Sequence, residues 1–115
     1  MKEWMKLTLI NLGFTEAEAE VYIFLTTQSP KTARDIAEAL NLYRSQIHRI
    51  LNRLKINGAI DVSSEYPARF SAVIFEKVLE LLIQAKKEQH KALVASKEEL
   101  ISTWKSITEK DNEKS

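Results

Sequence analysis

Cysteine is missing from this sequence, and glycine and proline are scarce, with two of each among 115 residues. The lack of cysteine excludes disulfide bonds and thiolate metal sites, and it fits a reducing interior. With glycine only at Gly13 and Gly58, no glycine-rich phosphate-binding loop can form. The two histidines, His48 and His90, fall in separate segments without carboxylates at metal-ligand spacing. We find no catalytic constellation, and we expect neither an enzyme nor a bound cofactor.

Long hydrophobic runs and a strong overall charge are also absent. The longest apolar run, residues 21–25, is far too short to span a bilayer, and the N-terminus shows no signal-peptide pattern. The formal net charge is +1, and 44% of the residues are hydrophobic, which is enough for one domain with a core. We therefore expect a soluble, cytoplasmic protein that does not enter the membrane.

Residues 32–58 contain two short amphipathic segments joined by a tight turn. Isoleucine and leucine recur at helical spacing in both segments, so both helices need the same small core. Thr32 is suited to begin the first helix, and Asn41 can end it in the left-handed conformation. Gly58 can end the second helix in the same way. The pattern predicts a helix-turn-helix.

The second of these helices, over residues 43–57, carries positive charge only. It contains four cations and neither Asp nor Glu, although the whole chain is nearly balanced. A solvated surface is the ordinary explanation of a charged run, but such a surface would normally mix signs for pairing between turns. Arg, Gln, Ser and Asn on an exposed helix supply the donors and acceptors that contact base edges and phosphates in a DNA major groove.

Two further helices are predicted before the helix-turn-helix. Residues 2–11 form an amphipathic segment that includes Trp4, and its apolar set is rich enough to pack on the domain or on a second subunit. Thr15 and Glu18 make a capping box, with Phe14 placed as a hydrophobic staple. A helix must therefore begin at this point.

The periodicity changes from helical to alternating after Gly58. Apolar and polar residues alternate on both sides of a turn at Tyr66 and Pro67, which predicts a β-hairpin over residues 60–73. A hairpin that follows a basic second helix is the order of a winged helix, whose hairpin, the wing, lies along the DNA backbone. Arg69 lies near the tip, although a hairpin that only covers the core is an equal alternative for this residue.

Residues 75–107 contain neither glycine nor proline and are mostly good helix formers. Spacings of three and four give a heptad seam that Lys86, Gln89 and Ser96 interrupt, which leaves open a parallel coiled coil or a broader antiparallel bundle. A monomer whose long helix folds back on its own domain is the competing arrangement. We expect a homodimer through a helix over 75–108, with a frayed tail over 109–115. The predicted dimer-interface residues are Trp4, Leu79, Leu82, Leu93, Leu100, Trp104 and Ile107.

Three stretches of the sequence resemble one known family. LGFTEAEAEVYIFL, TARDIAEALNLYRSQIHRILNRLKINGAI and YPARFSAV together are similar to the N-terminal winged-helix domain of the TrmB-like transcription regulators, common in archaea. The resemblance covers about residues 7–75; either the LGFTEAE opening or the RSQIHRIL segment alone would also suit MarR-like or ArsR-like proteins. It implies sequence-specific binding of promoter DNA by a dimer, with a wing at 66–69. The DNA-facing residues that it implies are Arg44, Ser45, Gln46, His48 and Arg49.

Two features depart from the family pattern. Tyr43 stands where many helix-turn-helix proteins have a capping Ser or Thr. Larger members also carry a C-terminal sugar-sensing domain, for which this sequence lacks the length, so a sugar effector is not implied and any effector is unknown.

The sequence thus predicts a mainly α protein with a small β-hairpin (α+β), a winged helix-turn-helix at 1–74 with a long C-terminal dimerisation helix. We expect a regulator of transcription that places its recognition helix, 43–57, in the major groove of a palindromic double-stranded operator. A winged-helix protein-protein interaction module of a transcription complex is the alternative, but it predicts a polar or apolar second helix. RNA binding is weaker, because aromatic stacking platforms are absent from this surface. The predicted DNA-binding residues are Thr32, Tyr43, Arg44, Ser45, Gln46, His48, Arg49, Asn52, Arg53, Tyr66 and Arg69.

Overall fold

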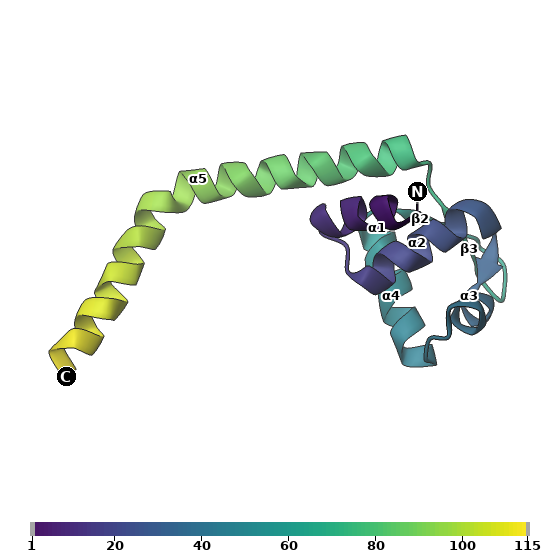
Figure 1. Ribbon diagram of the computed structural model, residues 1–115, viewed down its shortest axis with the longest axis horizontal. Coiled ribbons are helices and arrows are strands. Elements are labelled where there is room, and N and C mark those ends of the chain that lie inside the picture. The colour runs from purple at the N-terminus through teal and green to yellow at the C-terminus, as the bar shows by residue number, and fades with distance from the viewer. Residues whose placement is uncertain (1, 115) are drawn as a thin grey trace. The chain divides into compact units, whose positions relative to one another are not determined.

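A computed structural model describes the backbone of residues 2–114 and the side chains of residues 3–109. The chain forms two compact units, Met1–Ile83 and Gln84–Ser115. Figure 1 shows the elements of the first unit and the long helix that continues into the second. The elements in chain order are α1 (Lys2–Asn11), α2 (Glu16–Gln28), β1 (Lys31–Thr32), α3 (Ala33–Leu40), α4 (Arg44–Ile56), β2 (Ile60–Val62), β3 (Arg69–Ala72) and α5 (Phe75–Lys114).

Helix α2 begins with the capping box that the sequence predicts. The backbone N–H of Glu18 donates to Thr15 Oγ1 over 3.1 Å, and the backbone N–H of Thr15 donates to Glu18 Oε1 over 2.9 Å. Each bond satisfies a backbone donor that the first turn of a helix leaves unpaired. The start of α2 is therefore fixed by two residues close in sequence, and this prediction is confirmed.

The turn between α3 and α4 also follows local sequence signals. Thr32 caps α3 by accepting the backbone N–H of Asp35 at 3.2 Å. Asn41 ends α3 with φ 57° and ψ 48°, the left-handed conformation that Asn tolerates better than most residues. Gly58 follows α4 with a φ of 77°, which suits a residue without a Cβ. The predicted helix-turn-helix is confirmed.

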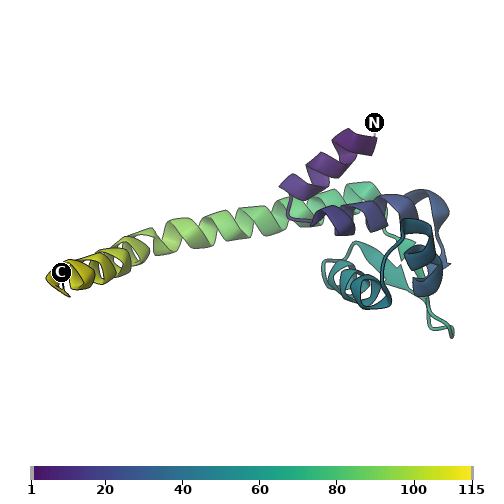
Figure 2. The same ribbon diagram turned by 60° about the horizontal axis from the view of Figure 1, so that its bottom comes forward.

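The hairpin belongs to a three-stranded antiparallel sheet of order β1-β3-β2. Strand β2 pairs with β3 in a register that places Val62 opposite Phe70, as predicted for a hairpin. Strand β1, of only two residues, pairs with the other edge of β3 and was not predicted, because two residues show no alternation. The loop that joins β2 and β3 extends from the edge of the first unit in both Figure 1 and Figure 2.

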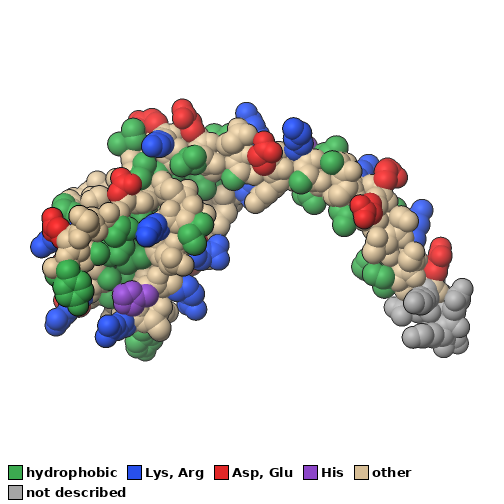
Figure 3. All heavy atoms as spheres, turned by 180° about the vertical axis from the view of Figure 1, so that it is seen from behind, with side chains coloured by type: hydrophobic (Ala, Val, Ile, Leu, Met, Phe, Trp, Pro, Cys, Tyr) green, Lys and Arg blue, Asp and Glu red, His purple; other side chains and the backbone are tan. Residues whose placement is uncertain are grey.

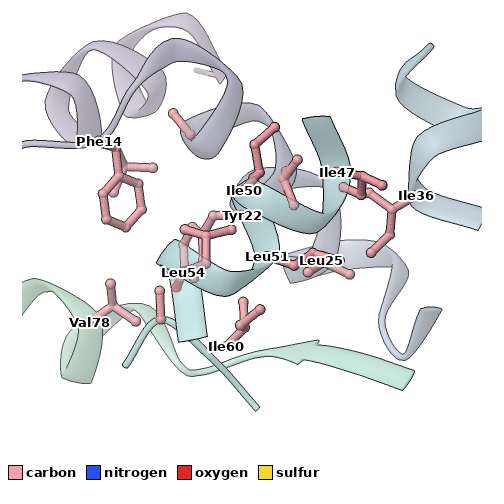
Figure 4. Close-up of a cluster of buried hydrophobic side chains, with 14 of the residues drawn as sticks. Phe14, Tyr22, Leu25, Ile36, Ile47, Ile50, Leu51, Leu54, Ile60 and Val78 are labelled. Carbon is pink, nitrogen blue, oxygen red and sulfur yellow. The ribbon is translucent and has the colours of Figure 1, made fainter. Parts of the chain in front are cut away.

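One hydrophobic core joins the helices of the first unit to β2. Figure 4 shows Tyr22 and Leu25 of α2 in the same cluster as Ile47 and Leu54 of α4, with Val78 of α5 at its edge. Since Val78 and Leu82 are buried, the first turns of α5 belong to the core. The first compact unit accordingly extends to Ile83 and includes these turns.

Helix α5 runs from Phe75 to Lys114, so the expected helical end at residue 108 and the expected frayed tail at 109–115 do not match the backbone. No glycine or proline occurs in this stretch, and nothing in the sequence ends the helix earlier. The side chains of 110–115 and all of Ser115 lie outside the described residues.

Helix α1 packs on α2 and also forms ion pairs with it at the surface. The Lys6 ammonium lies 2.8 Å from Glu16 and 3.1 Å from Glu20. Hydrogen bonds to these two carboxylates raise the pKa of Lys6, and the bond from Lys6 lowers the pKa of Glu16. Leu9 of α1 is fully buried, so packing rather than the exposed ion pairs carries most of the attachment.

Tyr22 links α2 to the segment between β3 and α5. Its hydroxyl donates to the carbonyl oxygen of Val73 over 2.8 Å, while its ring is buried in the core. Burial, with a smaller contribution from the charge of Glu76, raises the pKa of Tyr22 to about 12. The hydrogen bond therefore lies where water cannot easily replace it.

We expect Tyr22→Phe to lower the free energy of unfolding by about 1 to 2 kcal/mol, because it removes a buried bond and leaves the Val73 carbonyl without this donor. Urea unfolding followed by circular dichroism, at one fixed protein concentration, measures the loss. Tyr66→Phe is the matched control, since Tyr66 is fully exposed. Equal unfolding midpoints for wild type and Tyr22→Phe would contradict the assignment.

Candidate nucleic-acid interface

Helix α4 has one buried face and one open face. Its aliphatic residues from Ile47 to Leu54 enter the core, which directs the opposite side of the helix to solvent. Ser45, Arg49 and Asn52 follow one another at helical spacing along this open side, and all are exposed. We call these three residues the outer stripe of α4.

Positive charge accompanies the outer stripe. Arg44 and His48 lie one turn apart along one flank, and both are exposed. Among the side chains that the structure describes, neither Arg44 nor Arg49 forms an ion pair. Figure 3 shows Lys and Arg side chains gathered around the lower part of the first unit, where α4 lies. These two arginines are free to meet an anionic partner.

Gln46, a predicted DNA contact, also forms a hydrogen bond within the protein. Its Oε1 accepts the backbone N–H of Tyr43 over 2.8 Å, which satisfies a donor at the start of α4. This bond is the glutamine half of a capping box, and the other half, in which a Ser or Thr at position 43 would accept a backbone N–H of the first turn, is not formed by the tyrosine. Since its oxygen is taken, Gln46 offers a partner its amide N–H groups.

Arg53, unlike Arg44 and Arg49, forms an ion pair. Its Nε lies 2.7 Å from Oε2 of Glu18, and Glu18 is only 2% exposed. The sequence prediction of Arg53 as a free DNA contact missed this partner on α2. A helical wheel of α4 alone cannot find a bond to another helix.

Three other predicted contact residues lie at the end of β1 and in the β2–β3 wing. Thr32 uses its hydroxyl oxygen to cap α3 and is half-buried. Tyr66 is fully exposed in the loop of the hairpin. The Nε of Arg69 lies 3.5 Å from Glu65, an acidic neighbour that weakens its attraction for phosphate. The wing therefore offers less net positive charge than α4.

The predicted dimer residues fall into two groups. Trp4, Leu93, Leu100, Trp104 and Ile107 all have more than half of their surface exposed within this chain. Leu82, in contrast, is 8% exposed and lies in the core, so little of its side chain is left for the predicted contact with a second chain. Leu82 belongs to the heptad seam, but it packs into the core of the first unit. The heptad pattern alone could not show this.

Leu79 is half-buried. From residue 84 to residue 109, every described side chain is exposed or half-buried. The apolar residues of this part also include the exposed Val94 and Ile101. Together with Leu93, Leu100, Trp104 and Ile107 they form a broad apolar stripe, which we call the α5 stripe.

The described residues contain neither a metal-binding cluster nor a membrane-spanning helix. No group of three or more His, Cys, Asp or Glu side chains lies close enough to hold a metal ion in the part of the chain that the structure describes. Over the same residues, no helix has the length and apolar character needed to cross a membrane.

Comparison with known proteins identifies the family. The model described as "Sugar-specific transcriptional regulator TrmB" matches residues 9–76. The chain is 41% identical over 63 residues to YrhO of Bacillus subtilis (strain 168), a match that covers 55% of this chain and 23% of YrhO. The chain thus spans about a quarter of the length of this relative.

Solved structures share the fold at low sequence identity. The transcriptional regulator Tm0710 from Thermotoga maritima has a TM-score of 0.58 and 14% identity, and covers 100% of this chain and 89% of its own. A mutant of S. aureus MepR bound to an oligodeoxyribonucleotide has a TM-score of 0.57 and 20% identity, over 99% of this chain and 89% of its own. The predicted mainly α winged-helix fold is confirmed. Because the family model covers more than half of the chain, this protein belongs to the TrmB family of transcriptional regulators.

Proposed function

We propose that the protein is a sequence-specific regulator that binds double-stranded DNA, with α4 in the major groove and the β2–β3 wing on the backbone. The observation that supports this most is the outer stripe of α4 with its unpaired Arg44 and Arg49, held rigid by a core on the opposite face. Such a helix can bring amide, hydroxyl and guanidinium groups to base edges. The family and the oligodeoxyribonucleotide bound to the MepR mutant agree with it.

The protein would act as a homodimer on a palindromic operator. Two winged helices related by a two-fold axis read half-sites about 34 Å apart or a multiple of it. The α5 stripe supplies apolar surface for the pairing of two chains. This role would place the protein with the DNA of the cell, in the cytoplasm, without an enzymatic activity.

Electrophoretic shift with a duplex selected from random DNA by the protein itself tests the proposal. We expect binding that weakens steeply with salt, because each phosphate contact releases counterions with a slope of about 0.9 per contact. A selected duplex should bind at least about a thousandfold more tightly than a random one, as specific complexes do. Failure to enrich any sequence, with no binding to duplex DNA at low salt, would favour the protein-interaction module instead.

A further inference from the structure

Glu18 is a buried carboxylate that joins two helices. Only 2% of the residue is exposed, and its two oxygens have different partners. Oε1 accepts the backbone N–H of Thr15 at 2.9 Å, and Oε2 lies 2.7 Å from Nε of Arg53. One side chain thus connects the first turn of α2 to the last turns of α4.

The ion pair between Glu18 and Arg53 is a direct polar contact between α2 and α4. A groove runs along the same seam, lined by Thr15, Ala17, Glu18, Gln46, Arg49, Ile50 and Arg53. The groove lies beside the buried Ile50, and the ion pair joins α2 and α4 across it. Arg49 of the outer stripe lies about one turn from Arg53 and lines the same groove.

Stability alone gives a weak reason for such a pair. Removing a carboxylate from water is costly, and a well-packed apolar pair at such a site is often as stable or more so. What the ion pair adds is a defined geometry, since both oxygens of Glu18 must meet donors on separate elements. The rotation and depth of α4 against α2 are then fixed together.

We propose that Glu18 is a positioning residue for DNA recognition, which anchors Arg53 and thereby sets how α4 presents Arg49 and its neighbours to the major groove. Arg53, whose side chain is 57% exposed, acts in this arrangement through its Nε as an anchor on Glu18 rather than as a phosphate contact. The inference rests on the proposed DNA-binding function and concerns how that function is made precise.

Glu18→Gln is the first test, because it keeps the size of the side chain but not its bonding. A carboxylate offers two acceptor oxygens, whereas an amide offers one, so Gln cannot accept from both Thr15 and Arg53. We expect operator binding to weaken about tenfold in a folded protein, while binding to a random duplex, which depends on phosphate contacts, changes less than about threefold.

Two substitutions at Arg53 form a matched pair. The amide nitrogen of Gln occupies the same place along the side chain as Nε of Arg, so Arg53→Gln can still donate to Glu18. Arg53→Met places a methyl group there and cannot. We expect Arg53→Gln to bind the operator within about threefold of wild type and with the same salt slope, whereas Arg53→Met should lose about tenfold.

The opposite pattern would show a direct phosphate contact. In that case Arg53→Gln and Arg53→Met weaken binding equally, each with a salt slope lower by about one per contact, and Glu18→Gln binds as well as wild type. That result overturns the proposal. Circular dichroism and thermal melts establish which variants are folded at the assay temperature, and either Glu18→Gln or the Arg53 pair is sufficient for the decision.

Three further outcomes separate this inference from the proposed function. If Glu18→Gln and Arg53→Met both lose the fold, the pair serves stability and the positioning role is overturned. If wild type binds no duplex, the DNA-binding function itself fails. If wild-type protein binds the operator, and substitutions of Arg44 and Arg49 weaken this binding while those of Glu18 and Arg53 do not, the proposed function stands. The positioning role of Glu18 is then overturned.

Discussion

Changing Leu93 and Leu100 to glutamate together is expected to convert a dimer into a monomer and to weaken operator binding about a hundredfold or more. Both residues are more than half exposed within this chain and lie one heptad apart on the α5 stripe. A helix of this kind gains little from its own isolated turns, so its apolar side chains need a partner. A second copy of the same helix presents the same stripe, and a two-fold axis can join the two.

The size of the effect follows from the number of side chains involved. Burying one leucine contributes roughly 1.5 to 3 kcal/mol, and a symmetric dimer loses four such leucines in the double variant. Two glutamates from each chain would also face the apolar stripe of the other without a counter-charge. A monomer meets one half-site only and loses the gain that linkage of two half-sites provides.

Sedimentation equilibrium at micromolar concentration measures the change. Ala95→Glu with Ser102→Glu is the matched control, because these exposed residues have the same heptad spacing on the other side of α5. The control should remain a dimer and bind the operator normally. A monomer for the intact chain as well as for the double variant would rule the dimer out, and dissociation of the control to the same extent would contradict the choice of stripe.

Local signals explain why so much of the fold could be predicted. The capping box of Thr15 and Glu18, the left-handed Asn41 and the aliphatic face of α4 each depend on residues within one or two turns of each other. The alternation of the hairpin is also local. Such patterns are encoded in short windows of sequence, so their secondary structure follows without knowledge of the tertiary fold.

Features that depend on distant partners could not be predicted in the same way. The sequence assigned Glu18 to a cap and Arg53 to DNA, but it gave no sign that they meet. Leu82 has the spacing of an interface residue, yet the path of the chain after β3 directs it into the core. Each of these outcomes depends on how elements pack, which periodicity does not encode.

Charge gave a partial view of the candidate interface for the same reason. The four cations of 43–57 correctly marked α4 as the basic helix, but tertiary contacts decide which of them are free. Arg53 is held by Glu18, while Arg44 and Arg49 have no acidic partner among the described residues. The wing shows the same effect, because Glu65 accompanies Arg69.

The unpaired state of Arg44 and Arg49 leads to the second prediction of a large effect. We expect Arg44→Ala with Arg49→Ala to weaken operator binding by about a hundredfold while the fold is kept. A base contact contributes about 1 to 3 kcal/mol to discrimination, and each phosphate contact that is lost lowers the salt slope by about one. Both side chains are exposed, whereas Ile47 and Ile50 are buried, so the core should not change.

Shift assays over a range of salt concentrations, with the selected operator and with single-base variants of it, separate the two kinds of contact. Loss of a base contact relaxes the preference at one position, whereas loss of a phosphate contact weakens all sequences alike and lowers the slope. Lys91→Ala with Lys105→Ala removes two exposed cations from α5 and serves as the control for net charge. If the arginine variant binds with the affinity and slope of this control, α4 is not the DNA-reading helix, since a general loss of positive charge would then explain the whole effect.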